Sequence, residues 1–149
     1  IGDRGTDSPA LYNHKAFLFD KEKELLVIPI TLAEFGDKKP QYDWEYGEYT
    51  FQGAYVYNIN LIDGFDLKGR ITHYNEEDFK KMGYYFYGDY SIGRSLYIEN
   101  ILYTLSNNML KLNNLNTLEE LKQIEFEKYN IEYYPMYAED SVAGSVGIK

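Results

Sequence analysis

Residues 58–71 (NINLIDGFDLKGRI) and 111–124 (KLNNLNTLEELKQI) decide the fold, because they align with each other at a shift of 53 residues. In both stretches, apolar and polar residues alternate on either side of a short run rich in Asn, Asp or Gly. A repeat built in this way predicts strands joined by turns. The aligned pairs are Asn60 with Asn113, Ile62 with Leu115, Asp63 with Asn116, Phe65 with Leu118, Asp66 with Glu119 and Ile71 with Ile124.

The overlapping segment 117–129 also fits a helix. Thr117 stands at its N-cap position and Glu120 at the capping-box position, and the apolar residues that follow fall on one helical face. Periodicity alone favours this helix. The repeat favours a strand, so we expect a strand over residues 121–126 and keep the helix as the alternative.

A repeat of this length that carries four short strands is typical of a β-propeller blade. We therefore predict an all-β fold of antiparallel, four-stranded propeller-type blades, about two in number and so only part of a propeller. Within a single β domain over residues 1–149, we expect blade one at 15–74, blade two at 84–126 and a tail or exchanged strand at 127–149. The expected strands are 15–20, 25–32, 49–62, 67–74, 95–99, 101–105, 109–113 and 121–126.

Composition narrows the classes of function. The chain carries a net charge of −9, which repels phosphate backbones, so a nucleic-acid partner is not expected. The sequence has no cysteine and therefore no disulfide or zinc–thiolate site. No apolar run reaches the roughly 18–20 residues that span a bilayer. Tyrosine is the most frequent aromatic residue, with 17 copies, and it favours half-buried strand surfaces.

The segments GDRGTDSPALYNHKAFLFDKEKELLVIPI, GAYVYNINLIDGFDLKGRITH and RSLYIENILYTLSNNMLKLNNLNTLEELKQIEF carry a family resemblance. Over residues 2–126 the chain resembles the closing blades of secreted bacterial and archaeal proteins with a C-terminal β-propeller domain, distantly similar to WD-repeat propellers. The resemblance implies an extracellular or cell-surface location. We predict a non-catalytic role in binding or assembly, with a protein or a glycan as partner.

A partial propeller has open sheet edges, which can pair with strands of another chain. A closed propeller needs at least about four blades. We therefore expect self-association through these edges, with the segment after Tyr129 as a candidate for strand exchange.

Residues 34–47 predict a protruding loop, because the segment is polar, aromatic and longer than an ordinary hairpin turn. Tyr42, Trp44 and Tyr46 alternate there with acidic residues, and such a surface can stack on a sugar ring or surround a cation. The alternative is that these rings fold down onto the blade and cover its apolar face.

His14 and Asp7 are the remaining candidates for ligand binding. Their alternative role is to hold the N-terminal loop together by hydrogen bonds. No metal-binding spacing and no nucleophile motif is present, so we predict no catalytic residue, metal or cofactor. The rival hypothesis is a glycan-acting hydrolase, with paired carboxylates drawn from Asp3, Asp7, Asp43 and Glu45. We expect His73 to lie on a solvent face or in blade packing.

Overall fold

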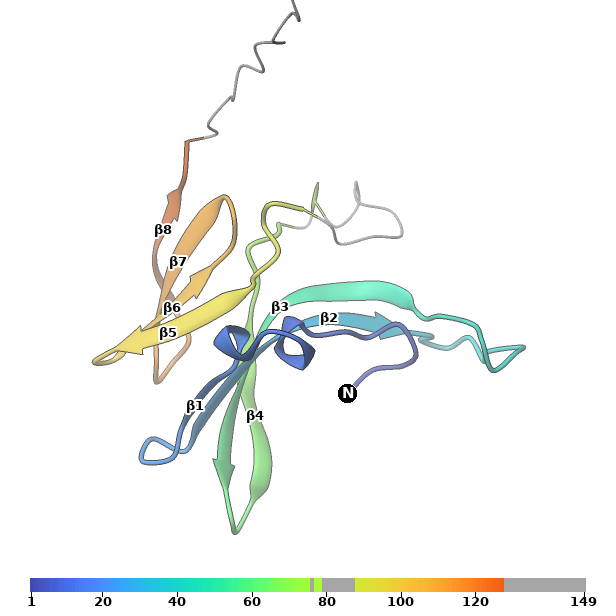
Figure 1. Cartoon of the computed structure of the whole chain (residues 1–149), viewed down its shortest axis with the longest axis horizontal. Helices are drawn as coiled ribbons and strands as arrows, with labels where there is room; N and C mark the ends of the chain where they lie inside the picture. Colours follow the sequence, from blue (N-terminus) through green and yellow to red (C-terminus); the bar gives the residue numbers. More distant parts are fainter. Residues whose placement is uncertain (76, 79–87, 128–149) are drawn as a thin grey trace, which may run out of the picture.

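The computed structural model describes residues 1–75, 77–78 and 88–127, and its strands form two four-stranded antiparallel sheets (Figure 1). In each sheet, strands that follow one another in the sequence lie side by side. The predicted all-β fold is therefore confirmed. Sheet 1 contains β1 (Leu18–Asp20), β2 (Leu25–Glu34), β3 (Glu48–Asn60) and β4 (Gly64–Ile71). Sheet 2 contains β5 (Arg94–Ile98), β6 (Ile101–Leu105), β7 (Met109–Asn114) and β8 (Glu120–Glu125).

The helical alternative for residues 117–129 is wrong where the structure describes them, because Glu120–Glu125 is strand β8. This strand pairs antiparallel with β7, and Ile124 lies opposite Leu110. Every residue of β8 is exposed. A helix in this segment would need a buried apolar face to be stable, and these residues bury none. The backbone pairing with β7 therefore determines that the segment is a strand.

Three of the hairpins contain the same kind of turn, in which the side chain of an Asp or Asn accepts hydrogen bonds from the backbone that follows it. Asp20, Asn60 and Asn114 each end a strand, and in each case the Oδ1 atom accepts the backbone N–H groups of the residues two and three positions later, at 2.8–3.1 Å. The repeat predicted from the sequence is thus displaced by one position here, since Asn60 corresponds to Asn114 and not to Asn113. The residue four positions after each turn residue has a positive φ: Glu24 at 51°, Gly64 at 72° and Leu118 at 61°.

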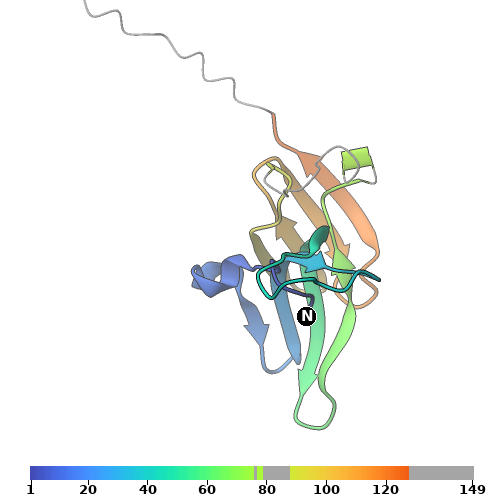
Figure 2. The ribbon, with the colours of Figure 1, turned by 90° about the vertical axis from the view of Figure 1, so that its right-hand side faces the viewer.

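The main hydrophobic core lies between the two sheets (Figure 2). One face of sheet 1 packs there against Leu102 of β6 and against Leu115 in the turn before β8. Leu102 is completely buried. The strands of sheet 1 contribute Leu25, Val27, Ala54, Val56 and Ile71 to this core.

Polar contacts also join the two sheets. The side-chain amide of Gln52 donates to the carbonyl of Ile92 at 3.1 Å and accepts the N–H of the same residue at 3.0 Å. Lys68 Nζ donates to the carbonyl of Leu115 at 2.8 Å. The Tyr97 hydroxyl donates to the Asp20 carboxylate, a hydrogen bond that lowers the pKa of Asp20.

The N-terminal segment, which the sequence predicts as a loop, is tied to sheet 1. Asp7 and Thr31 form an antiparallel bridge, and two short 3-10 helices follow at Pro9–Leu11 (η1) and His14–Ala16 (η2). Because η2 takes up residues 14–16, β1 begins three residues later than expected. Among the described residues, no helix is long and apolar enough to cross a membrane.

Sheet 1 and sheet 2 each correspond to one expected blade. The grouping of both blades into a single domain stays a prediction, as does most of the expected tail, because residues 128–149 lie outside the described part of the chain.

Candidate functional site

The loop between β2 and β3, residues 35–47, extends away from the sheets at the right of Figure 1. The rings of Tyr42 and Trp44 stack on each other, with centroids 4.4 Å apart and planes at 8°. Trp44 is 63% exposed and Tyr42 is 47% exposed. The two rings therefore form an open aromatic surface and do not cover the apolar face of the blade.

Arg4 of the N-terminal segment braces this loop. Its guanidinium lies 5.1 Å from the centre of the Tyr46 ring and donates to the carbonyl of Asp43 at 3.1 Å. The Arg4 carbonyl accepts the N–H of Gly47 at 2.8 Å. A side chain at Gly5, which has a φ of 107°, would place its Cβ 2.9 Å from the Tyr46 ring. The GDRG segment thus fits closely against the base of the loop.

A hollow of about 480 Å³ is lined mostly by other residues of the same loop, and neither Tyr42 nor Trp44 is part of its lining. Within it, the Glu45 carboxylate accepts the backbone N–H of Gln41 at 2.9 Å. Lys38 pairs with Glu48 at 2.5 Å, and both side chains are exposed. The hollow therefore offers hydrogen-bonding groups on the loop that also carries the stacked aromatic pair. Its lining consists of Phe35, Lys38, Lys39, Gln41, Glu45, Tyr46 and Glu48.

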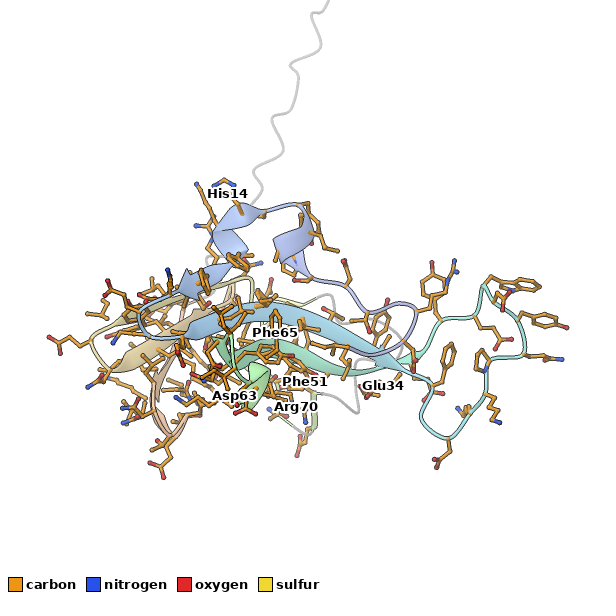
Figure 3. All side chains as sticks on the ribbon, turned by 90° about the horizontal axis from the view of Figure 1, so that it is seen from below. His14, Glu34, Phe51, Asp63, Phe65 and Arg70 are labelled. Atoms are coloured by element: carbon orange, nitrogen blue, oxygen red, sulfur yellow. The ribbon has the colours of Figure 1, made fainter. Side chains whose placement is uncertain are left out.

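The structure separates His14 and Asp7 from the aromatic loop. His14 projects from η2 away from the sheets, whereas Glu34 marks the point where the loop leaves β2 (Figure 3). Within the described residues, no hydrogen bond joins His14 to Asp7; the Asp7 carboxylate accepts the N–H of Ser8 at 2.8 Å. Asp7 lines a different cavity, of about 490 Å³, together with Tyr12, Thr31, Tyr49, Gln52, Asp89, Ser91, Ile92 and Asn107 among others.

The four carboxylates considered for hydrolysis do not share one cavity. Asp3 accepts the N–H of Phe35 at 2.8 Å, so it serves as a brace for the loop. Glu45 lines the hollow beside the loop, and Asp7 lines the second cavity. In the second cavity the additional carboxylate is Asp89, which the sequence did not single out. The described part of the chain contains no cluster of three or more acidic or histidine residues suited to a metal ion.

Comparison with known families assigns the fold. A family described as the beta propeller domain matches residues 1–118, which is most of the chain. The chain belongs to the beta propeller domain family. No curated protein and no solved structure matches it. The family resemblance expected from the sequence is thus confirmed for this propeller domain.

Sequence reasoning missed the residues that support the loop of this propeller domain. Arg4 and Gly5 lie about 40 positions before the rings that they contact. Their signal in the sequence is the glycine-rich GDRG segment, which predicts a loop but does not indicate what the loop contacts. Gln41 and Lys39 gave no signal, since polar residues are expected in any exposed loop.

Proposed function

We propose that this propeller domain is a non-catalytic binding and assembly module of a secreted or cell-surface protein, and that residues 35–47 bind its ligand. The stacked and exposed pair of Tyr42 and Trp44 carries the proposal. Apolar ring surface that is exposed to water is unfavourably hydrated, so a ligand that covers the two rings gains binding free energy. The extracellular location rests on the resemblance of the sequence to secreted propeller proteins.

A glycan is the ligand that this loop fits best. A sugar ring has an apolar C–H face that can stack on the Trp44 indole, and hydroxyl groups around its rim. The hollow on the same loop offers partners for those hydroxyl groups, among them the side chains of Gln41 and Lys39. Because Arg4 and Gly47 hold the base of the loop, less conformational entropy is lost on binding.

The loop can be tested by its own fluorescence, because Trp44 is the one tryptophan of the sequence. We expect neutral oligosaccharides to change its emission in a saturable way. Calorimetry should show binding about tenfold weaker for Trp44→Ala and for Tyr42→Ala, the size expected for loss of one aromatic contact. Phe126→Ala is the matched control, because this exposed aromatic residue follows β8 and lines neither cavity.

Three results would count against this assignment. A panel of neutral glycans that leaves the Trp44 emission unchanged would exclude the sugar ligand. Equal loss of binding in the Phe126→Ala control would show that the loss is not specific to the loop. If the loop binds a protein and no glycan, its ligand is a protein and the glycan assignment is wrong.

A second candidate function, a glycan-acting hydrolase, is favoured by one observation: Asp7 and Asp89 line the same cavity. Paired carboxylates about 5–10 Å apart are what glycoside hydrolysis needs. This candidate predicts that the protein releases reducing sugars from a polysaccharide. Asp7→Asn and Asp89→Asn should each abolish that release, whereas the glycan affinity of the loop should stay unchanged.

Assembly is the other half of the proposal. In the described part of the chain, β1, β4, β5 and β8 are the outer strands of the two sheets, and outer strands can pair with another chain. Propeller domains commonly mediate protein interactions. We propose that copies of this chain associate with one another.

A further inference from the structure

The second cavity, of about 490 Å³, lies where the N-terminal segment, two strands of sheet 1, the connection before β5 and the turn between β6 and β7 meet. Its deepest lining residues are Gln52 and Ile92, which are 2% and 1% exposed and are hydrogen-bonded to each other. Cavities of roughly 300–1,000 Å³ typically hold small organic molecules. This cavity is therefore large enough for an organic ligand and much larger than a bare metal ion.

Two acidic residues that line the cavity are anchored to different sheets. Asp7 belongs to sheet 1, because its backbone N–H and carbonyl both pair with Thr31 of β2 at 2.9 Å. Asp89 is attached to sheet 2, because its carbonyl accepts the N–H of Asn108, in the turn between β6 and β7, at 2.9 Å. The Asp89 carboxylate also accepts the side-chain amide of Asn108 at 3.3 Å. The backbone positions of both acidic residues are thus fixed without a ligand.

Neither carboxylate has a cationic partner among the residues that the structure describes. The Asp7 carboxylate accepts the N–H of Ser8, and the Asp89 carboxylate accepts the neutral amide of Asn108. The described lining of the cavity contains no lysine, arginine or histidine, and Arg94 lines an adjoining hollow instead. Two carboxylates in one cavity repel each other, so a bound cation is favoured there. The net charge of −9 adds a long-range attraction for cations.

The cavity also has room for an uncharged chain next to the cation. Gly93, just before β5, is part of the lining, and a Cβ built on it would meet no atom within 4 Å. Tyr12 and Tyr49 line the same cavity. Tyrosine rings pack against alkyl chains and attract cations to their faces. The lining therefore fits a ligand with a positive end and an aliphatic body.

We propose that this cavity binds the primary ammonium group of an alkylamine, with Asp7 and Asp89 as its anionic partners. The three N–H donors of an ammonium group point in different directions and can serve carboxylates on separate walls, whereas the donors of a guanidinium lie in one plane. The ammonium group belongs either to a free polyamine or to a lysine side chain of another protein. The inference goes beyond the proposed function, because the loop that binds the glycan lies outside this cavity. It assigns the two carboxylates to binding instead of to hydrolysis.

Titration calorimetry with pentylamine tests the charged partners. Wild-type protein should bind pentylamine in a saturable way and should not bind the uncharged pentanol. Asp7→Asn and Asp89→Asn should each weaken binding about three- to fivefold, as expected for an exposed ion pair, and the double variant at least about tenfold. Both substitutions keep a side-chain oxygen for the hydrogen bonds to Ser8 and Asn108. Asp66→Asn, at an exposed position of β4 outside the cavity, removes the same charge and should bind as the wild type does.

A steric variant tests the location of the site without changing the charge. Gly93→Leu should occupy the open space of the cavity and weaken pentylamine binding at least about tenfold. Circular dichroism and thermal unfolding should match those of the wild type, because a Cβ at this position meets no neighbour. Binding that is unchanged in Gly93→Leu would overturn the assignment to this cavity.

Two further titrations distinguish the sources of the ammonium group. Spermidine and an end-blocked peptide with a single lysine should each lose affinity in the double variant of Asp7 and Asp89. The larger loss identifies the natural source, since the loss measures the part of the affinity that the two carboxylates supply. If neither ligand loses affinity in the double variant, the proposal is wrong.

Three other results would overturn the proposal. The first is the absence of saturable pentylamine binding by the wild type. The second is equal weakening in Asp66→Asn, which would show that the amine responds only to the net charge of the chain. The third is release of reducing sugars that stops in Asp7→Asn or Asp89→Asn, which would assign the carboxylates to hydrolysis. Glycan binding by the loop should be unchanged in every cavity variant, so the failure of one site is distinguishable from the failure of the other.

Discussion

His73, in the segment after β4, places its Nε2 atom 2.9 Å from the Thr104 Oγ1 atom of β6. Its other ring nitrogen lies 2.9 Å from the hydroxyl of Ser106. The ring is buried, and burial, together with the positive charge of Lys111, lowers the pKa of His73 from 6.5 to about 4. A neutral imidazole thus connects the end of one blade to the next.

The low pKa of His73 predicts acid sensitivity. His73 takes up a proton near pH 6.5 in the unfolded chain but only near pH 4 in the folded chain. The stability that comes from keeping His73 neutral is therefore complete above pH 6.5 and is lost as the pH falls to about 4. The full loss is about 3 kcal/mol. Chemical denaturation at pH 7 and pH 4.5 should show a smaller pH dependence for His73→Gln than for wild type. The exposed His14→Gln control should keep the wild-type dependence, and equal dependence in all three chains would contradict the assignment.

The buried side-chain amide of Gln52 should make a large contribution to the free energy of unfolding. Its side chain is 2% exposed and provides both hydrogen-bond partners of the Ile92 backbone. Gln52→Leu should lower the free energy of unfolding by about 1–3 kcal/mol for each backbone group left unpaired. Urea denaturation measures this loss. The same substitution at the exposed Gln123 in β8 should change stability by less than about 0.5 kcal/mol. Similar values at both positions would show that the Ile92 contact is unimportant.

Replacing Glu99 should stabilise the protein. It lies in the turn between β5 and β6 with a φ of 54°, and it is exposed. A left-handed backbone conformation costs a residue with a Cβ about 1–2 kcal/mol more than it costs glycine. Glu99→Gly should therefore raise the free energy of unfolding by about 1 kcal/mol, measured by thermal and urea denaturation. Lys122→Gly, within strand β8, should lower it. Destabilisation by Glu99→Gly would mean that the carboxylate has a structural role.

The strands were predictable because their signals are local. Each hairpin combines alternating apolar residues with an Asp or Asn at the strand end, as in Asn60 and Asn114. The displacement of the repeat by one position was not predictable, because two asparagines stand side by side at 113 and 114 and only the hydrogen bonds distinguish them. The pairing of Asp7 with Thr31 was also missed, since a single bridge leaves no periodic pattern.

The candidate site was predictable only in its residue types. The sequence marked Tyr42 and Trp44 correctly as members of a long loop, but alternation alone does not distinguish exposed rings from rings that cover a sheet. The role of Arg4 and the burial of His73 depend on partners more than 30 positions away. Such contacts have no local signal, because they arise only when the sheets pack.

The position of β8 has a practical consequence for anyone who divides this protein. The family match stops at residue 118, two residues before β8 begins. An expressed fragment cut at that point would lose the outer strand of the second blade, leave β7 as a bare edge and remove Glu120, the ionic partner of Lys111. Fragments intended for crystallisation or display should therefore extend at least to Glu125.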